Sequence, residues 1–242
     1  MKLVIFSDIH GNQYAFRELM RDVAQMSDDE YDMVVFCGDI LGYYYGQTEI
    51  VASMKKLSSM LQAQGKQFIA VRGNHDEFGL QISRQERLPE EFWEKYGHSY
   101  GQTKLEVIEY IAGLPTKIEF SIDGKQIAVV HGTPLDELDG RQYPADDVPE
   151  ELSKKYQEYD LVIGGHTHYR MDRTEGNTRI INPGSLGQQR DGLGFCYAML
   201  DTVTDELKYI DISFDIDSLE QECMQHDPDN DKLRTILHRG NR

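Results

Sequence analysis

Lys2-Leu3-Val4-Ile5-Phe6-Ser7-Asp8-Ile9-His10-Gly11-Asn12 joins a short apolar run to two polar side chains. Residues 3–6 have the length and composition of a strand buried in a sheet. Asp8 and His10 follow two residues apart, so an extended backbone would point both side chains to the same side. The Gly-Asn pair behind them is a turn signal. A carboxylate and an imidazole that leave a strand together suit a metal site better than a core.

The chain after residue 12 alternates between helix and strand patterns. Asn12 is a candidate N-cap for a helix, and apolar runs at 33–37 and 68–71 predict two further strands around a helix at 50–61. This order predicts a parallel sheet covered by helices. In such sheets ligands bind beyond the carboxyl ends of the strands.

Residues 77–113 contain no motif and predict a helical insertion beside the site, with one helix starting near Pro89 and another at 105–111. Asp123-Gly124 predicts a hairpin. A helix at 149–156, a strand at 161–163 and short strands near 171, 180, 195–200 and 207–212 follow. A C-terminal helix is predicted at 215–242, with Asp217 and Glu220 as a capping box and an interruption at Pro228. We expect a single domain, 1–242.

Polar residues follow five of the predicted strands. They are Asp8, His10, Asp39, Asn74, His75, Asp76, His131, His166 and His168. Taken singly, such residues are more often caps, turn residues or loop histidines. Together they include five of the eight histidines, and the other three, His98, His226 and His238, are expected at the surface.

Imidazole, carboxylate and amide ligands suit Mn, Fe or Zn, with Ni or Co as further candidates, better than Ca or Mg. The set has no thiolate, which argues against a structural zinc cage. Two Asp, four His and one Asn are too many ligands for one ion. They suit two divalent transition-metal ions bridged by Asp39, and such pairs, about 3.5–4 Å apart, promote phosphoryl displacement.

The motifs Asp8-Ile-His10, Gly38-Asp39, Gly73-Asn74-His75-Asp76, His131 and Gly165-His166-Thr167-His168 occur in the order of the calcineurin-like metallophosphoesterase superfamily, which the chain resembles. The segment 182–192 resembles the small bacterial and archaeal phosphoesterase branch. The resemblance implies an α/β fold, a four-layer αββα sandwich in which two mixed β-sheets are flanked by helices.

The resemblance also divides the site residues between two ions. It implies that Asp8, His10 and His168 bind one ion, that Asn74, His131 and His166 bind the other, and that Asp39 bridges them. His75 would then donate a proton to the leaving oxygen and be oriented by Asp76, while a water activated by the ions attacks phosphorus.

Three residues are candidate substrate contacts. The helix start at Asn12 would bring backbone N–H groups near a phosphate. Arg190 is a candidate phosphate contact or an ordinary surface arginine. Tyr43, in the run of tyrosines 43–45, would stack on a base or pack in the interior; the packing interpretation is preferred.

The predicted function is hydrolysis of small phosphodiesters or phosphomonoesters, with nucleotides among the candidates. The alternative enzyme is a symmetrical dinucleoside polyphosphate (diadenosine tetraphosphate) hydrolase, and the rival of another class is a non-catalytic metal-binding interaction module. Ser/Thr phosphatases of the superfamily, and one group of dinucleoside tetraphosphate hydrolases, carry an arginine shortly after Gly-Asp. Residues 40–45 lack it, which argues against protein phosphatase activity.

Composition limits the partners. The net charge of −17 over 242 residues weighs against stable nucleic-acid binding, although bound cations would still allow an anionic substrate. Three cysteines without a pairing pattern, a four-residue apolar run too short for a signal peptide and no membrane-length apolar stretch predict a cytoplasmic protein. Homo-oligomer formation is left open.

Overall fold

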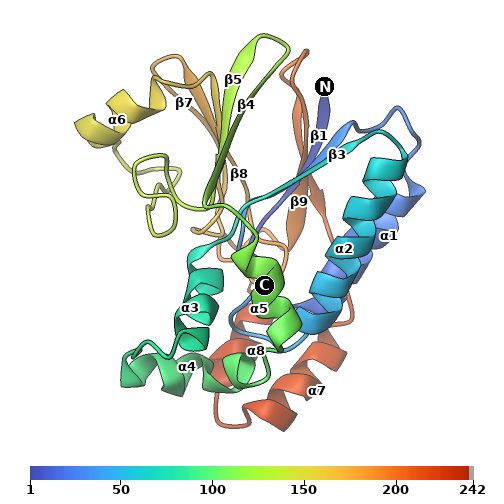
Figure 1. Ribbon diagram of the computed structural model, residues 1–242, viewed down its shortest axis with the longest axis vertical. Helices are drawn as coiled ribbons and strands as arrows, with labels where there is room; N and C mark the ends of the chain where they lie inside the picture. Colours follow the sequence, from blue (N-terminus) through green and yellow to red (C-terminus); the bar gives the residue numbers. More distant parts are fainter. Residues whose placement is uncertain (240–242) are drawn as a thin grey trace.

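Two five-stranded mixed β-sheets lie face to face in the computed structural model of the protein, which describes residues 1–239 (Figure 1). The first sheet has the order β10 (Leu207–Asp211), β9 (Cys196–Asp201), β1 (Lys2–Phe6), β2 (Met33–Phe36) and β3 (Gln67–Ala70). The second has the order β4 (Lys117–Ile122), β5 (Lys125–Val130), β6 (Leu161–Ile163), β8 (Thr178–Pro183) and β7 (Arg170–Glu175).

Both sheets are mixed because each contains parallel and antiparallel strand pairs. In the first, β1 pairs in parallel with β2 and β2 with β3, whereas β9 runs antiparallel to β1 and β10 to β9. In the second, β5, β6 and β8 are parallel, and hairpin partners β4 and β7 close the two edges. The expected Asp123-Gly124 hairpin joins β4 and β5.

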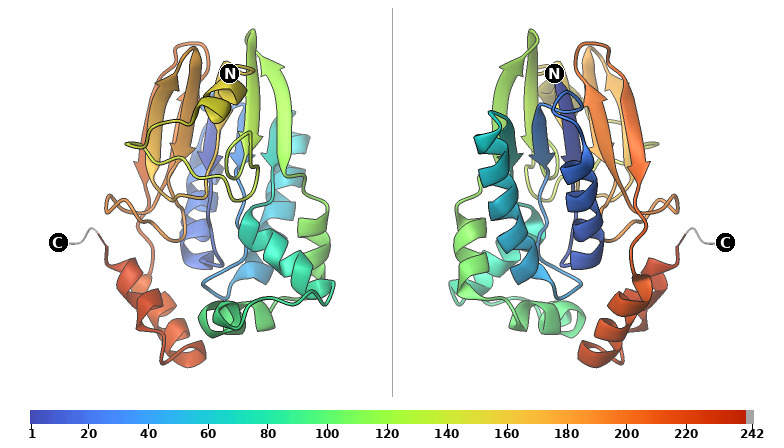
Figure 2. Two further views of the ribbon diagram at one scale, coloured as in Figure 1. Left: turned by 90° about the vertical axis from the view of Figure 1, so that its left-hand side faces the viewer. Right: turned by 90° about the vertical axis from the view of Figure 1, so that its right-hand side faces the viewer.

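Helices cover the outer faces of both sheets (Figures 1 and 2). The described helices are α1 (Gln13–Gln25), α2 (Gln47–Ala63), α3 (Asn74–Ser83), α4 (Glu90–Gly101), α5 (Leu105–Ala112), α6 (Glu150–Tyr156), α7 (Ile216–His226) and α8 (Asp231–Leu237). Helices α1 and α2 pack on the first sheet, and α6 packs on the second. The predicted four-layer αββα sandwich is confirmed.

Alternation along β1 shows how the sequence builds this core. Leu3 and Ile5 belong to the cluster between the two sheets, whereas Val4 and Phe6 belong to the cluster under the helices. All four side chains are fully buried. Because both faces of the strand are covered, it reads as a continuous apolar run.

The C-terminal region is helical on both sides of the predicted interruption at Pro228, but its helix cap differs from the predicted one. It forms two helices, α7 and α8, separated around Pro228, while residues 240–242 lie outside the described part of the chain. The cap of α7 is Asp215, whose carboxylate accepts a hydrogen bond from the N–H of Ser218 (3.0 Å), and not the expected box of Asp217 and Glu220. The helix therefore begins one residue before Asp217.

Candidate metal centre

The ligand candidates leave the strands in strained backbone conformations. Asp8, His10, Asp39, His166 and His168 all have φ between 51° and 67°, in the left-handed region that residues other than glycine rarely adopt. Such conformations cost free energy and persist where the surrounding structure holds them, which is common at functional sites. The fold thus turns these side chains toward one point at the strand ends.

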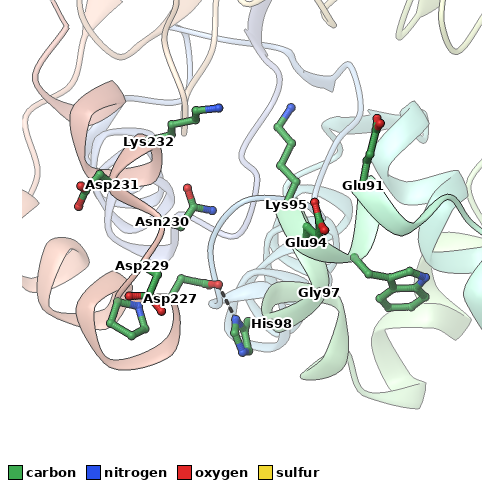
Figure 3. A pocket seen from close by; sticks show the side chains of 12 residues that line it. Glu91, Glu94, Lys95, Gly97, His98, Asp227, Asp229, Asn230, Asp231 and Lys232 are labelled. Carbon is green, nitrogen blue, oxygen red and sulfur yellow. Dashed lines mark hydrogen bonds and ion pairs between the residues drawn. The ribbon is translucent and has the colours of Figure 1, made fainter.

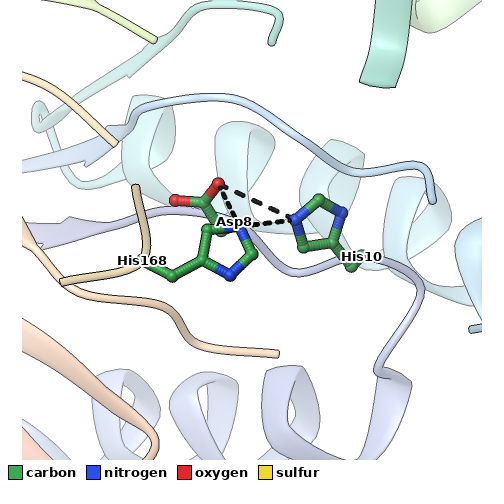
Figure 4. Close-up of side chains that lie close together, drawn as sticks. All are labelled: Asp8, His10 and His168. Atoms are coloured by element: carbon green, nitrogen blue, oxygen red, sulfur yellow. Dashed lines mark hydrogen bonds and ion pairs between the residues drawn. The ribbon is translucent and has the colours of Figure 1, made fainter. Parts of the chain in front are cut away.

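Asp8, His10 and His168 form the first group (Figure 4). Nδ1 of His10 lies 2.7 Å from the carbonyl of Leu41, and Nδ1 of His168 lies 2.5 Å from that of Gln188. Because a carbonyl only accepts, each Nδ1 carries a hydrogen and a neutral ring presents a lone pair at Nε2.

The Nε2 atoms of His10 and His168 are only 3.0 Å apart. The Nε2 atom of His168 also lies 3.2 Å from Oδ1 of Asp8, a buried oxygen that has no hydrogen-bond partner within residues 1–239. Two lone pairs and an unpartnered carboxylate oxygen facing one another repel unless a cation lies among them. This arrangement fits a metal ion.

His131, Asp39 and Asn74 form the second group. Nδ1 of His131 donates to the carbonyl of Cys37 (2.7 Å), which leaves Nε2 facing Oδ2 of Asp39 (3.2 Å) and Oδ1 of Asn74 (3.1 Å). Burial opposes the charged ring of His131, but the Asp39 and Asp8 carboxylates and the Cys37 carbonyl together outweigh burial and raise the pKa of His131 to about 10. A field that favours a proton at this nitrogen also favours a metal cation.

Asp39 connects the two groups. Its Oδ2 lies 3.6 Å from Nε2 of His10 and 3.2 Å from Nε2 of His131. Burial alone would raise the pKa of Asp39, but the rings of His131, His75 and His10 together outweigh burial and hold this pKa well below its usual value. The carboxylate is therefore ionised and lies between the groups, as a bridging ligand requires.

His166 lies at the margin of the centre. Its Nδ1 is 3.1 Å from Oδ1 of Asn74, and its Nε2 accepts a hydrogen bond from Nε of Arg141 (3.1 Å). The three groups of carboxylate and imidazole atoms within 4.8 Å of one another include His75, which the sequence assigned to proton donation, but not His166. The buried His/Asp clusters, with Asn74 between His131 and His166, fit a dinuclear centre.

His75 and Asp76 make different contacts. Nδ1 of His75 lies 3.0 Å from the hydroxyl of Tyr100. The Asp76 carboxylate instead accepts from the backbone N–H groups of Gly73, Asp39, Ile40 and Leu41, at 2.9–3.0 Å. It thereby ties the loop after β2 to the start of α3. The expected orientation of the His75 ring by Asp76 is not among these contacts.

Burial lowers the pKa of His75 to about 4, so the ring of the free protein is neutral near pH 7. An anionic phosphate opposite the ring would favour its charged form, because an opposite charge at close range stabilises it.

Arg190 and Tyr43 line one cavity of about 440 Å³ at the metal centre. Nη2 of Arg190 donates to the Tyr43 hydroxyl (2.7 Å), and the Tyr43 ring meets the His10 ring edge-on at 4.7 Å. Tyr43, Tyr44 and Tyr45 all belong to one buried cluster with side chains of α7 and α8. The preferred packing interpretation thus describes all three tyrosines, and Tyr43 in addition lines the cavity.

Asn12 has a structural role. The residue is fully buried, its Oδ1 accepts from the N–H of Ala15 (3.0 Å), and its Nδ2 donates to the carbonyl of Gly187 (3.1 Å). The predicted N-cap is confirmed. Asn12 does not line the 440 Å³ cavity, and its side chain serves the helix and the neighbouring loop. The contact of backbone N–H groups at this helix start with a phosphate stays a prediction.

Sequence reasoning missed two cations and an aromatic wall of the cavity. Lys95 from α4 and Arg141 from the loop after β5 line it, as do Phe78, Phe92 and Tyr96. None belongs to a motif. Their only signal was that four of them, all but Arg141, lie in the helical segment 77–113 expected beside the site.

A second cavity of about 740 Å³ lies between α4 and the segment that joins α7 to α8 (Figure 3). Glu91 and Lys95 line both cavities, so the two adjoin. Nδ1 of His98 and Oδ1 of Asp227 lie 2.5 Å apart across this outer cleft, as Figure 3 shows. His98, His226 and His238 form no part of the His/Asp clusters found within residues 1–239.

Among residues 1–239, no helix combines the length and the apolar character needed to cross a membrane.

Comparison with known proteins identifies relatives along most of the chain. Residues 1–205 match the model of the calcineurin-like phosphoesterase superfamily domain. An uncharacterized protein of Methanocaldococcus jannaschii is 28% identical over 239 residues, which cover 88% of each chain. A hypothetical protein from Pyrococcus horikoshii has a similar structure (TM-score 0.82, 20% identity, 99% of this chain and 98% of that one). So has a metallophosphoesterase from Sphaerobacter thermophilus (TM-score 0.76, 24% identity, 99% and 100%).

Proposed function

Since the chain belongs to the calcineurin-like phosphoesterase superfamily, we propose that it hydrolyses small phosphodiesters or phosphomonoesters, with nucleotides among its substrates. The observation that carries the proposal is the cavity of about 440 Å³, which is lined both by candidate metal ligands and by Lys95, Arg141 and Arg190. Three cations around one cavity of a chain with net charge −17 favour an anionic group there.

Two divalent ions would be held by the residues of the two groups described above. Asp8, His10 and His168 would hold one ion, Asn74, His131 and His166 the other, and Asp39 both. Mn is the preferred ion on ligand chemistry, with Fe, Zn, Ni or Co as alternatives. When bound, the ions polarise phosphoryl oxygens and lower the pKa of a water that attacks phosphorus.

The chain's own residues bind the ester and supply the proton. Arg190 and Arg141 offer planar sets of N–H donors that match phosphate oxygens, and Lys95 adds a third charge. His75 lines the same cavity and donates a proton to the leaving oxygen. Tyr43 holds Arg190 through its hydroxyl, which orients the guanidinium toward the cavity.

Hydrolysis of symmetrical dinucleoside polyphosphates is the second candidate. The adjoining outer cleft favours it, because a substrate with a second bulky end has room there. The carboxylates of Glu91, Glu94, Asp227, Asp229 and Asp231 oppose it, since they would repel a polyphosphate chain that entered the cleft. We therefore keep the small ester as the primary proposal.

Three free cysteines, all buried, support a reducing, cytoplasmic location.

The test is hydrolysis across a panel with Mn²⁺ or with EDTA. It compares p-nitrophenyl phosphate, bis-p-nitrophenyl phosphate, a cyclic nucleotide and diadenosine tetraphosphate. Turnover that EDTA abolishes supports the proposal, and the preferred ester decides between the two candidates. Protein that binds two ions per chain and turns over none of these esters would contradict both enzymes and favour a binding module.

A further inference from the structure

Two hydrogen bonds connect the Tyr100 hydroxyl to a single residue, His75. The hydroxyl donates to the backbone carbonyl of His75 (2.8 Å) and lies 3.0 Å from Nδ1 of its ring. Burial holds the pKa of Tyr100 well above its usual value, so the hydroxyl keeps its one hydrogen. That hydrogen is used on the carbonyl, and the hydroxyl oxygen must therefore accept from Nδ1–H.

This pair of bonds selects one tautomer of the neutral ring. With the hydrogen on Nδ1, the exchangeable position is Nε2, for which no hydrogen-bond partner occurs among residues 1–239. The His75 ring lines the 440 Å³ cavity beside Asp39 and Arg190. Nε2 is thus the nitrogen left to exchange a proton with a bound ester.

Tyr100 is itself held rigidly. It lies in the last turn of α4, is 5% exposed, and packs on Phe92 with ring centroids 5.0 Å apart. The neighbouring Ser99 anchors the turn, because its hydroxyl donates to the carbonyl of Gly42 (2.5 Å) and its own carbonyl accepts from Nε2 of Gln47 (2.8 Å). The hydroxyl therefore has little freedom to leave His75.

We propose that Tyr100 is the positioning residue for His75: by accepting from Nδ1–H it directs Nε2 at the leaving oxygen of the ester. The inference rests on the proposed function, in which His75 supplies the leaving-group proton. It assigns to α4 the orienting role that Asp76 cannot take while its oxygens accept from four backbone N–H groups.

The proton transfer balances with water as the second reactant. As the oxygen of the attacking water bonds to phosphorus and its proton passes to solvent, the bond between phosphorus and the leaving oxygen breaks. The electron pair of that bond moves to the leaving oxygen, which takes the proton from Nε2 of the charged ring, the form that the bound anionic ester favours. The ring is left neutral with its hydrogen on Nδ1, the form that Tyr100 accepts from. Solvent then returns a proton to Nε2.

Leaving groups of different basicity separate this role from a structural one. An alkoxide needs a proton as it departs, whereas p-nitrophenolate leaves as a stable anion. If the protein hydrolyses monoesters, p-nitrophenyl phosphate is compared with glycerol 2-phosphate. If it hydrolyses diesters, bis-p-nitrophenyl phosphate is compared with a 2′,3′-cyclic nucleotide.

Tyr100→Phe keeps the ring and removes both hydrogen bonds. We expect kcat for the alkyl ester to fall at least about tenfold, which is part of the factor of about 10²–10⁴ that a proton donor contributes. The p-nitrophenyl ester should change less than about threefold, with KM and bound metal unchanged. In a His75→Ala background, Tyr100→Phe should add no further difference between the esters.

Tyr96→Phe is the matched control. Tyr96 lies on the same helix and meets the His75 ring edge-on at 5.0 Å, but its hydroxyl contacts that of Tyr43 (3.3 Å) and not His75. It should change both esters by the same factor. If Tyr100→Phe lowered kcat equally for both esters while His75→Ala lowered it more for the alkyl ester, the role of Tyr100 would be contradicted and the proton-donor role of His75 would stand. If His75→Ala lowered kcat equally for both esters, the proton-donor role in the proposed function would be contradicted.

A second measurement does not depend on activity or on the stability of a variant. ¹⁵N NMR of the imidazole nitrogens in metal-free wild-type protein reports which nitrogen carries the hydrogen. The expected result is Nδ1–H for the neutral His75 ring, and an Nε2–H tautomer would overturn the inference.

Discussion

Single residues at the metal centre are constrained by backbone packing as much as by ligand chemistry. Gly187 shows this: a Cβ there would lie 1.8 Å from the carbonyl oxygen of Ile9, a contact that no side-chain rotation relieves. The N–H of Gly187 also donates to the carbonyl of Asp8 (3.0 Å). The loop that carries Arg190 is therefore pressed against the segment that carries two metal ligands.

Gly187→Ala should destabilise the protein by about 1–3 kcal/mol, the usual cost of forcing extra volume into a packed interior, and should weaken metal binding, because Asp8 must move. Urea unfolding and metal titration measure the two effects. Gly101→Ala, where no atom lies within 4 Å of the added Cβ, is the control and should leave both nearly unchanged. Equal stabilities of the two variants would contradict the close contact.

At the scale of elements, the N-cap residue of α1, Asn12, connects this helix to the loop beside the metal centre. Asn12 caps the helix through Ala15 and holds the 184–194 loop through the carbonyl of Gly187. Asn12→Ala should cost about 1 kcal/mol for the cap, and leaving a buried carbonyl without its donor should add about 1–3 kcal/mol.

Asn12→Ser separates these two contributions. Serine keeps a capping oxygen but cannot replace the amide donor, so its loss in unfolding free energy should be about 1 kcal/mol smaller than that of alanine. Chemical denaturation compares the two variants. Identical losses would mean that the cap contributes nothing measurable.

Helix α4 contributes charge to the cavity as well as Tyr100. Lys95→Gln keeps most of the side chain and removes the charge, and we expect KM for anionic esters to rise about threefold to tenfold, less than for a buried charge-assisted hydrogen bond because Lys95 is exposed. The difference in KM between wild type and Lys95→Gln should shrink at high salt, since ions screen the charge of this exposed lysine. Lys104→Gln, an exposed lysine before α5, is the control. A KM increase of equal size there would indicate a nonspecific charge effect.

Across the whole molecule, the features that the sequence predicted are the strands and the polar side chains at their ends. Apolar runs located the strands, and parallel topology brought Asp8, Asp39 and Asn74 to one edge. Lys95, Tyr100 and Arg141 escaped prediction because the packing of α4 and of one loop, which follows no sequence period, decides where they lie. The left-handed backbone of the ligands was equally invisible, since it contradicts the local preference of Asp and His.

The ligand candidates come from both sheets, so metal should cross-link the two halves of the sandwich. Asp8, Asp39 and Asn74 follow strands of the first sheet, whereas His131 and His166 follow strands of the second. An ion that binds only the folded chain stabilises it by about 2.7 kcal/mol at a hundred times its Kd. For a chain of this length we therefore expect Mn²⁺ to raise the Tm of EDTA-treated protein by about 5–10 °C.

Differential scanning calorimetry with Asp39→Asn tests this cross-link. The variant should lose most of the metal-dependent rise in Tm, because the Asp39 carboxylate lies nearer to Nε2 of both His10 (3.6 Å) and His131 (3.2 Å) than the Asp8 carboxylate does (3.8 and 4.0 Å). Asp28→Asn, which alters a carboxylate 94% exposed at the surface, should keep the full rise. If both variants kept it, the ions would bind elsewhere on this acidic chain. If wild-type protein showed no rise, the buried lone pairs of His10 and His168 would need a partner other than a metal ion.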